Sequence, residues 1–430
     1  MTSEVALLNR SAVALAADSA TTVTYWENGQ FETRYFKGTN KIFQLSATHP
    51  VGIMIYAAAS LQGAPWDVLI KSYRETLGSK SHDDLPAYAT DLFDYIASNN
   101  HIFSAAIQEK QFKSDVDSVA ARIVVPIVRS DDFKNAADDP AKTAVLMRAI
   151  ADVQTKIDAD SFVGNTTQAD LDGTLSKFFA EIKAQFENDR YYIDMAKITV
   201  FDGLVNLAIS GLYKDNFTSL NSSGIVIAGF GDKDYFPNLR AYRCYGLVLG
   251  KLVIAEETNK AQAMSQANGS AIVPFAQDEM IRTFIYGMGS DVLRQLDTQF
   301  ARGADGLCED LLKAGIAVDV SSDPIKSAEL NKLKSEATEK FTDTFINYSV
   351  DSHSSPMRRV LGALPLDELA ELAETLVLLE SLKERVTRPS ASVSGPIDVA
   401  VISKNDGFIW IKRKHYFDPK LNQRYFTKLT

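Results

Sequence analysis

Two spacings of apolar residues alternate along the chain, and together they predict an α+β protein. Short apolar runs bounded by turn residues are typical of buried strands. Such runs occur at 5–8, 12–17, 41–45, 51–59, 399–403 and 407–413. Apolar residues three and four positions apart are typical of helices. Segments with that spacing occur at 61–77, 85–97, 143–158, 170–188, 191–213, 284–300 and 366–386.

The N-terminal segment carries the most informative of these patterns. A polar interruption, Asn9-Arg10-Ser11, separates its two apolar runs and predicts a turn between two buried strands. Asp18 follows the second run directly. The chain therefore begins with a buried strand pair that is closed by an acidic residue.

The next segment, 21–36, predicts a β-hairpin. β-formers alternate on both sides of Asn28-Gly29, and Asn-Gly between alternating strands is a strong signal for a tight hairpin turn. A further β-like run, 122–128, lies within a stretch, 99–221, that otherwise has helical spacing.

Composition narrows the class of protein. The chain has 430 residues, an apolar fraction of 46%, a charged fraction of 23% and a formal net charge of −10, values that fit a globular protein with a large core. The negative charge argues against nucleic acid and against an anionic membrane as partners. No apolar run approaches the ~18 residues that a membrane span needs, and the opening lacks the basic start of a signal peptide. We therefore expect a cytoplasmic protein.

Cysteine and histidine usage argues against a disulfide framework and against a metal site. Cys244 and Cys308 are the only cysteines and lie far apart in sequence, which fits a reducing compartment. The five histidines are scattered and show no paired spacing of the HExxH kind. Gly229-Phe230-Gly231 lacks the third glycine of a dinucleotide-binding loop. We expect neither a metal nor another cofactor.

Thr2 is the leading candidate for chemistry. A Met followed by a small residue is the kind of start that methionine aminopeptidase trims, and trimming would leave Thr2 with a free α-amine. An N-terminal Thr carries a hydroxyl nucleophile and a possible base on one residue, since the unperturbed pKa of an α-amine is near ~8. The sequence therefore predicts a nucleophile at Thr2.

The residues around this candidate resemble a known family. The chain resembles the opening of a proteasome β-subunit, a member of the N-terminal nucleophile (Ntn) hydrolases. The resemblance lies in Thr2, in Asp18 at a spacing that needs no gap, in Asn40-Lys41-Ile42-Phe43 and in the expected strand 51–60. The run 395–402 resembles a returning strand of bacterial proteasome homologues.

The resemblance implies a fold and a set of site residues. The fold would be a four-layer αββα sandwich, with 224–256 supplying adjacent strands of its second sheet. Thr2 would be the nucleophile, Lys41 would lower the proton affinity of its amine or hydroxyl, and Asp18 would anchor Lys41. A backbone N–H at Tyr56 or Ala57 would hold the oxyanion.

One part of the family pattern is incomplete in this chain. The loop before the returning strand should supply an Asp and a Ser near the nucleophile. Here that loop contains Ser390, Ser392 and Ser394 but no acid at the expected place. The three serines are therefore possible contributors, and activity depends on whether other groups replace the acid.

The resemblance also divides the chain. It predicts a core formed by 1–98, 222–300 and 365–430, interrupted by helical insertions at 99–221 and 301–364. Family members associate through helices that flank the sandwich, so the resemblance implies a homo-oligomer. Insertions of this length must cover the old contact surface or make a new one. We therefore expect a homo-oligomer smaller than a stacked ring, with an insertion-capped monomer as the alternative, in which 99–221 restricts access to Thr2.

The predicted function is an N-terminal threonine hydrolase, a protease or peptidase that cleaves amide bonds in peptides or proteins through an acyl-enzyme on Thr2. Two alternatives stay open. One is a catalytically inactive assembly or interaction subunit with the same fold, which the absent loop acid and the long insertions favour. The other is a ligase or transferase that passes the acyl group from Thr2 to a different acceptor.

Overall fold

The computed structural model describes residues 2–27, 30–387 and 395–424. Its first sheet has the strand order β13-β1-β2-β14-β15, and every neighbouring pair is antiparallel. The strands are β1 (Ser3–Asn9), β2 (Ala12–Ala17), β13 (Ser270–Ala276), β14 (Asp398–Ser403) and β15 (Gly407–Lys412). The predicted N-terminal strand pair thus lies at the centre of this sheet, and Asn9 Oδ1 closes its turn by accepting hydrogen bonds from the N–H groups of Ser11 and Ala12.

A second antiparallel sheet has the order β11-β10-β9-β6-β5, with the short strand β12 (Gln262–Ala263) pairing with β10. Its strands are β5 (Ile42–Gln44), β6 (Val51–Ala57), β9 (Ser223–Gly229), β10 (Asn238–Val248) and β11 (Lys251–Glu256). Segments more than 160 residues apart in sequence, β6 and β9, are therefore direct neighbours.

The two sheets pack face to face. Alternate side chains of both sheets form one apolar cluster between them, with Leu8 and Leu15 from the first sheet and Met54, Val226 and Leu239 from the second. All five are completely buried. Burial of this kind is the main favourable term in folding, at roughly 25 cal/mol per Å² of apolar surface.

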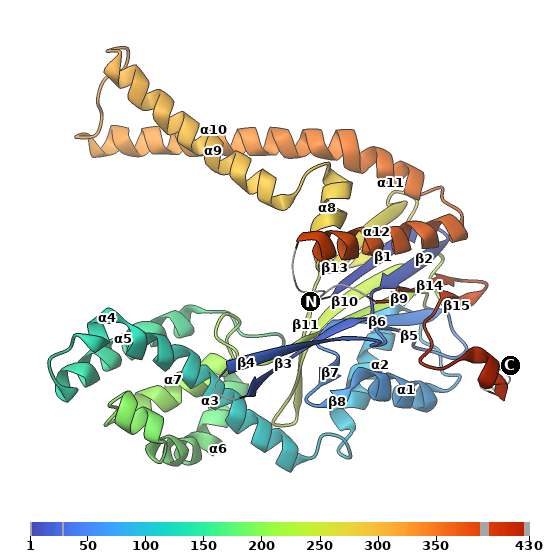
Figure 1. The fold of residues 1–430 in the computed structure, drawn as a ribbon, viewed down its shortest axis with the longest axis horizontal. Helices are drawn as coiled ribbons and strands as arrows, with labels where there is room; N and C mark the ends of the chain where they lie inside the picture. Colours follow the sequence, from blue (N-terminus) through green and yellow to red (C-terminus); the bar gives the residue numbers. More distant parts are fainter. Residues whose placement is uncertain (1, 28–29, 388–394, 425–430) are drawn as a thin grey trace.

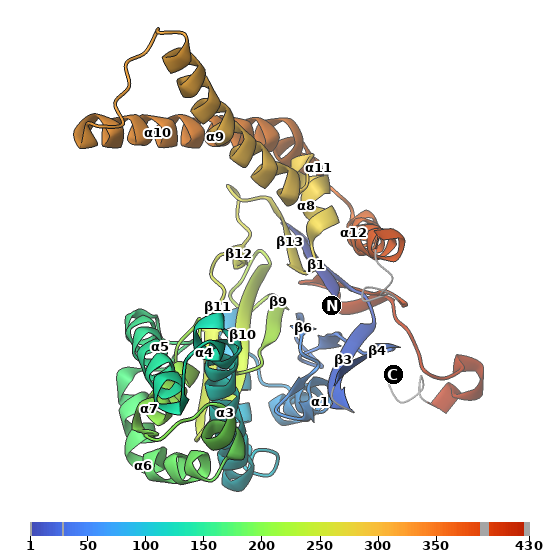
Figure 2. The same cartoon turned by 60° about the vertical axis from the view of Figure 1, so that its left-hand side comes forward.

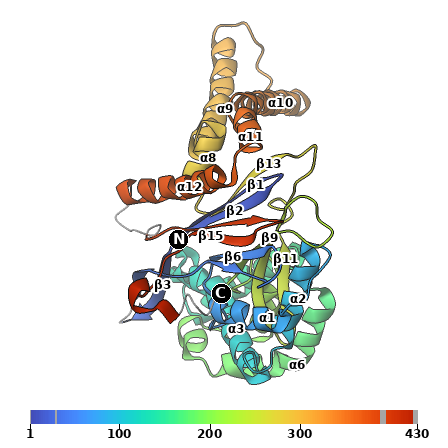
Figure 3. The same ribbon diagram turned by 90° about the vertical axis from the view of Figure 1, so that its right-hand side faces the viewer.

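Helices cover the outer faces of both sheets (Figure 3). On the first sheet lie α8 (Glu279–Tyr286), α11 (Ser355–Leu361) and α12 (Leu366–Thr387). On the second lie α1 (Trp66–Leu77), which follows the short strands β7 (Ser60–Leu61) and β8 (Ala64–Pro65), and α2 (Leu85–Ser98). The prediction of an α+β protein with antiparallel sheets is confirmed. The narrower prediction, a four-layer αββα sandwich of the Ntn type, stays a prediction.

The stretch 99–221 is helical and has its own apolar cluster, which also includes Val248 and Val253 of the second sheet. Its helices are α3 (Ala105–Arg129), α4 (Asp131–Lys134), α5 (Asp139–Ala159), α6 (Gln168–Glu187), the π-helix Tyr191–Met195 and α7 (Asp202–Leu212). The β-like run predicted at 122–128 is wrong, because these residues form the last turns of α3. The helix predicted at 191–213 is interrupted after Met195 and resumes at Asp202.

A long helical hairpin projects from the body of the molecule (Figures 1 and 2). It consists of α9 (Ser290–Lys313) and α10 (Pro324–Ser349), which continues through a π-helix (Val350–Ser354) into α11. Stacked rings of Phe300 and Phe341, with centroids 4.2 Å apart, join the two helices. The helix predicted at 284–300 is broken at Gly287, whose φ of 74° ends α8.

The predicted hairpin forms a separate two-stranded sheet, β3 (Ala20–Glu27) with β4 (Gln30–Lys37). Within the described ranges, no helix is long and apolar enough to cross a membrane.

The packing of β6 against β9 yields a stability prediction. A Cβ at Gly224 would lie 2.0 Å from Cζ of Tyr56, so the side chain and the ring cannot both keep their places. We expect Gly224→Ala to lower the free energy of unfolding by about 1–3 kcal/mol, as overpacking usually does. Gly173→Ala is the control, since the new methyl on α6 meets no atom within 4 Å and should stabilise the protein by about 0.5–1 kcal/mol. Urea denaturation measures both, and equal effects would contradict the packing described here.

Candidate functional site

Thr2 is held at the end of the first sheet, immediately before β1. Its side chain is 6% exposed. Its carbonyl oxygen accepts a hydrogen bond of 2.9 Å from the backbone N–H of Gln277, just beyond β13. Strand β1 is paired on both sides, by β13 and by β2. This pairing fixes the position of the backbone from which the Thr2 side chain extends.

Asp18 lies at the end of β2, beside the start of β1. One carboxylate oxygen accepts the backbone N–H of Ser3 at 3.1 Å, and the other accepts that of Ala20 at 3.2 Å. The side chain is buried. Asp18 therefore fixes the chain on the C-terminal side of Thr2.

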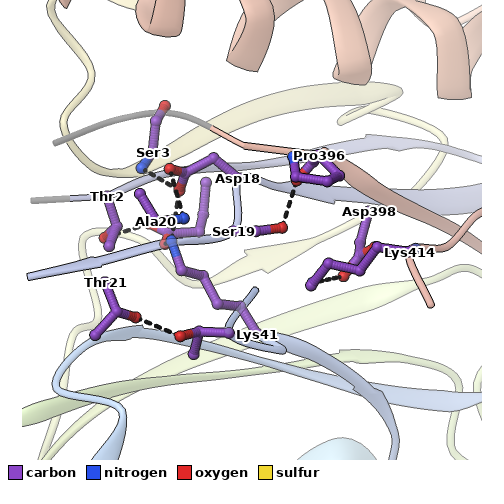
Figure 4. A network of polar contacts seen from close by, with 12 residues as sticks. Thr2, Ser3, Asp18, Ser19, Ala20, Thr21, Lys41, Pro396, Asp398 and Lys414 are labelled. Carbon is purple, nitrogen blue, oxygen red and sulfur yellow. Dashed lines mark hydrogen bonds and ion pairs between the residues drawn. The ribbon is translucent and has the colours of Figure 1, made fainter. Parts of the chain in front are cut away.

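Lys41 reaches the same place from the other sheet. It immediately precedes β5, is 5% exposed, and its ammonium is hydrogen-bonded to Oδ1 of Asp18. Figure 4 shows Thr2, Asp18 and Lys41 converging from three separate segments. The structure thus brings together the three residues predicted from the sequence, while their catalytic roles stay predictions.

Glu4 is a fourth member of this cluster, and the sequence analysis missed it. Its carboxylate lies between the other groups: Oε2 accepts a hydrogen bond of 3.2 Å from Oγ1 of Thr2, and Oε1 lies 3.1 Å from Nζ of Lys41. The side chain is completely buried. Glu4 is the one acid of β1 and stands directly before the apolar run 5–8. This was the available signal, since buried charges need partners.

Burial shifts the acid equilibrium of Glu4. Desolvation of the carboxylate raises the pKa of Glu4 from its ordinary 4.5 to about 7, and the negative charge of Asp18 acts in the same direction. The nearby ammonium of Lys41 opposes this rise but does not cancel it. Glu4 is therefore partly protonated near neutral pH.

A small cavity lies beside Thr2. Its volume is about 20 Å³, enough for one water molecule. The walls include Lys41, Tyr56 and Ala57 together with Thr2. Ala57 has a φ of 65°, a conformation that residues other than glycine rarely adopt and that often accompanies functional sites.

The side chain of Tyr56 is engaged by other residues. Its hydroxyl donates to the carboxylate of Glu257, which also pairs with Arg243 at 3.0 Å, and Nζ of Lys260 lies 3.2 Å from the same hydroxyl. Burial and the hydrogen bond to Glu257 raise the pKa of Tyr56 above its ordinary range. A role of Tyr56 or Ala57 in holding an oxyanion would therefore come from the backbone, and it stays a prediction.

Strand β14 lies beside β2 and begins close to the site. The hydroxyl of Ser19 donates to the carbonyl oxygen of Pro396 (Figure 4), and Asp398 is paired in register with Ala17. The carboxylate of Asp398 is bound by the ammonium and the backbone N–H of Lys414. The candidate loop residues Ser390, Ser392 and Ser394 lie outside the described residues.

Across the described ranges, no group of three or more His, Cys, Asp or Glu side chains is placed to hold a metal ion.

No protein-family model matches the chain, and no curated protein matches it either. Among solved structures, it is similar to an Anbu mutant from Hyphomicrobium sp. strain MC1, with 10% identity, a TM-score of 0.26, and coverage of 100% of this chain and 91% of that one. It is also similar to Anbu from Yersinia bercovieri, described as an ancestral β-subunit, with 10% identity, a TM-score of 0.23, and coverage of 99% and 94%.

These comparisons correct the identification made from the sequence. Membership of the proteasome β-subunit-like Ntn hydrolases, with bacterial proteasome homologues as relatives, is wrong as an assignment. It lacks a matching family model or curated relative, and the solved structures match at 10% identity with TM-scores of 0.26 and 0.23. Support for the roles of Thr2, Asp18 and Lys41 therefore comes from the geometry of this site and not from membership of a family.

The raised pKa of Glu4 predicts how stability depends on pH. The folded protein holds this proton more tightly than the unfolded chain does, so the stabilisation is complete below pH 4.5 and is lost as pH rises to about 7. Glu4→Gln has no such proton. The unfolding free energy of the parent should therefore fall relative to that of the variant across this window, by at most about 1.4 kcal/mol per pH unit. Denaturant titrations at several pH values test this, and parallel curves for the two proteins would contradict it.

Proposed function

We propose that the chain is an N-terminal threonine hydrolase, which cleaves amide bonds in peptides or proteins through an acyl-enzyme on Thr2. One observation carries the proposal: the buried hydroxyl of Thr2 is hydrogen-bonded into a carboxylate–ammonium–carboxylate series formed by Glu4, Lys41 and Asp18. A hydroxyl nucleophile beside a possible base, with a third group orienting that base, is the arrangement expected for covalent catalysis.

In this proposal, removal of Met1 leaves Thr2 at the end of the chain. Its oxygen attacks the carbonyl carbon of the substrate, a C–O bond forms, and an electron pair moves onto the carbonyl oxygen. Backbone N–H groups near Tyr56 and Ala57 would stabilise that oxyanion. The hydroxyl proton passes to a base, either the freed α-amine or a neighbouring carboxylate.

The intermediate then collapses. The C–N bond breaks, the leaving amine takes up a proton, and the acyl group stays on Thr2 as an ester. Attack by water releases the acid and restores the hydroxyl. The cavity beside Thr2 has room for one such water.

Two further expectations accompany this proposal and stay predictions. One is that the chain forms a homo-oligomer. The other is that 99–221 and 301–364 are insertions in a core, with 99–221 restricting access to Thr2.

The nucleophile assignment predicts the behaviour of two substitutions. Thr2→Ala removes the attacking oxygen and should abolish release of a fluorescent amine from a set of short peptide amides. Thr2→Ser keeps the hydroxyl and should retain measurable turnover. Thr2 donates one hydrogen bond from its side chain, so its loss should change the unfolding free energy by only about 1 kcal/mol. Equal turnover by Thr2→Ala and the parent would refute the assignment.

A further inference from the structure

We propose that Glu4 is the general base of this site: its carboxylate takes the proton of the Thr2 hydroxyl and returns it to the leaving amine. The inference rests on the proposed function, because it names the group that activates the same nucleophile. It assigns a catalytic role to a residue that touches the reacting oxygen.

The carboxylate of Glu4 lies where a general base for Thr2 must lie. A general base must lie within hydrogen-bond reach of the proton it removes, and Oε2 of Glu4 is the acceptor of the Thr2 hydroxyl at 3.2 Å. The other oxygen of the same carboxylate lies 3.1 Å from Nζ of Lys41. Lys41 is in turn bound to Asp18. Nucleophile, base and orienting group thus follow one another, as in other sites with an activated hydroxyl.

Asp18, the other acid, is engaged by the backbone and by Lys41. Its carboxylate oxygens accept the backbone N–H groups of Ser3 and Ala20 as well as the ammonium of Lys41. These contacts hold the carboxylate of Asp18 in place beside β1. Its role is therefore to position Lys41, whereas Glu4 faces the hydroxyl.

The electrostatic environment of Glu4 also suits a base. The groups that face Glu4 are Lys41 before β5, Asp18 after β2, Tyr56 on β6 and, on Thr2, the hydroxyl and the α-amine that removal of Met1 would free. With Met1 in place, burial raises the pKa of Glu4 to about 7, and a protonated amine on Thr2 would lower it from there. A base works best when its pKa lies near the operating pH, because it must both accept and return a proton. An ordinary exposed glutamate, with a pKa of 4.5, would be a much weaker base.

The resulting proton balance is complete without a further reactant. As the C–O bond forms, the proton of Oγ1 moves to Oε2 of Glu4 and the electron pair of the carbonyl moves to its oxygen. When the C–N bond breaks, the same proton passes from Glu4 to the nitrogen. In deacylation, Glu4 takes a proton from water and returns one to Oγ1 of Thr2.

If Glu4 had only a structural role, it would neutralise the charge of Lys41, and the rate of acylation would not follow the ionisation of Glu4. If Glu4 is the general base, that rate rises with pH as its carboxylate ionises. The test uses a β-lactone, a strained ester that acylates hydroxyl groups by ring opening. Its addition to the full-length protein is followed by intact mass from pH 5 to 9. Thr2→Ala keeps an amine at position 2 and measures background acylation.

For the parent protein, we expect acylation that depends on Thr2, with a rate that rises with pH and a midpoint at or below about 7. Glu4→Gln should acylate at least about 10²-fold more slowly, the usual loss when a general base is removed, and without that midpoint. The matched control is Asp115→Asn on α3. Burial also raises the pKa of Asp115, to about 6, and this substitution should leave both the rate and the midpoint unchanged.

The outcomes separate this inference from the proposed function. If Glu4→Gln keeps the parental rate and midpoint, Glu4 is not the base, although Thr2 may remain the nucleophile. If the parent shows no more acylation than Thr2→Ala, the proposed function fails and the role of Glu4 fails with it. If Glu4→Gln does not fold, as judged by circular dichroism, the parental profile decides. A midpoint at or below about 7 supports Glu4, and a midpoint of about 8 or higher indicates the α-amine and overturns the inference.

Discussion

One ammonium group shared by two buried carboxylates is the interaction on which this site depends. Lys41 lies before β5 of the second sheet, whereas Glu4 and Asp18 belong to the neighbouring β1 and β2 region of the first. The cluster therefore links the two sheets at the end where Thr2 lies. If the sheets shifted relative to each other, the ammonium would be separated from both acids. The geometry of the site therefore depends on the face-to-face packing of the two sheets.

This arrangement is expensive in free energy. Removing charges from water costs several kcal/mol per ion, and a buried ion pair is often no more stable than the apolar residues that could replace it. Burial of the Glu4 carboxylate raises the pKa of Glu4 to about 7, and the ammonium of Lys41, which Asp18 shares, only partly offsets this rise. A cluster with this cost is better explained by chemistry at Thr2 than by stability, and the proposed function accounts for each of its members.

Much of this arrangement could be predicted from the sequence. The strand pair 5–8 and 12–17 and the hairpin in 21–36 follow from apolar runs and turn residues. The grouping of Thr2, Asp18 and Lys41 was expected only from the resemblance to proteasome β-subunits.

Other features depend on contacts that sequence spacing does not express. Glu4 acquires its importance only when β5 brings Lys41 against β1. The run 122–128 is rich in β-branched residues and was assigned to a strand, but Val124 is completely buried in the cluster of α3–α7. Tertiary packing there overrides local propensity. The family assignment was wrong because it was based on a few matching residues. Such short motifs can describe a local arrangement but do not establish membership of a family.

The central claim is that Thr2 acts as the N-terminal nucleophile of the chain. The most direct measurement is the intact mass of untagged protein, combined with fragmentation of its N-terminal peptide. The account predicts a chain lighter by one Met residue, with an unmodified Thr2 carrying a free amine. Met1 present on essentially every molecule would contradict the account, because the hydroxyl of Thr2 would then stand next to a peptide bond and not at the end of the chain.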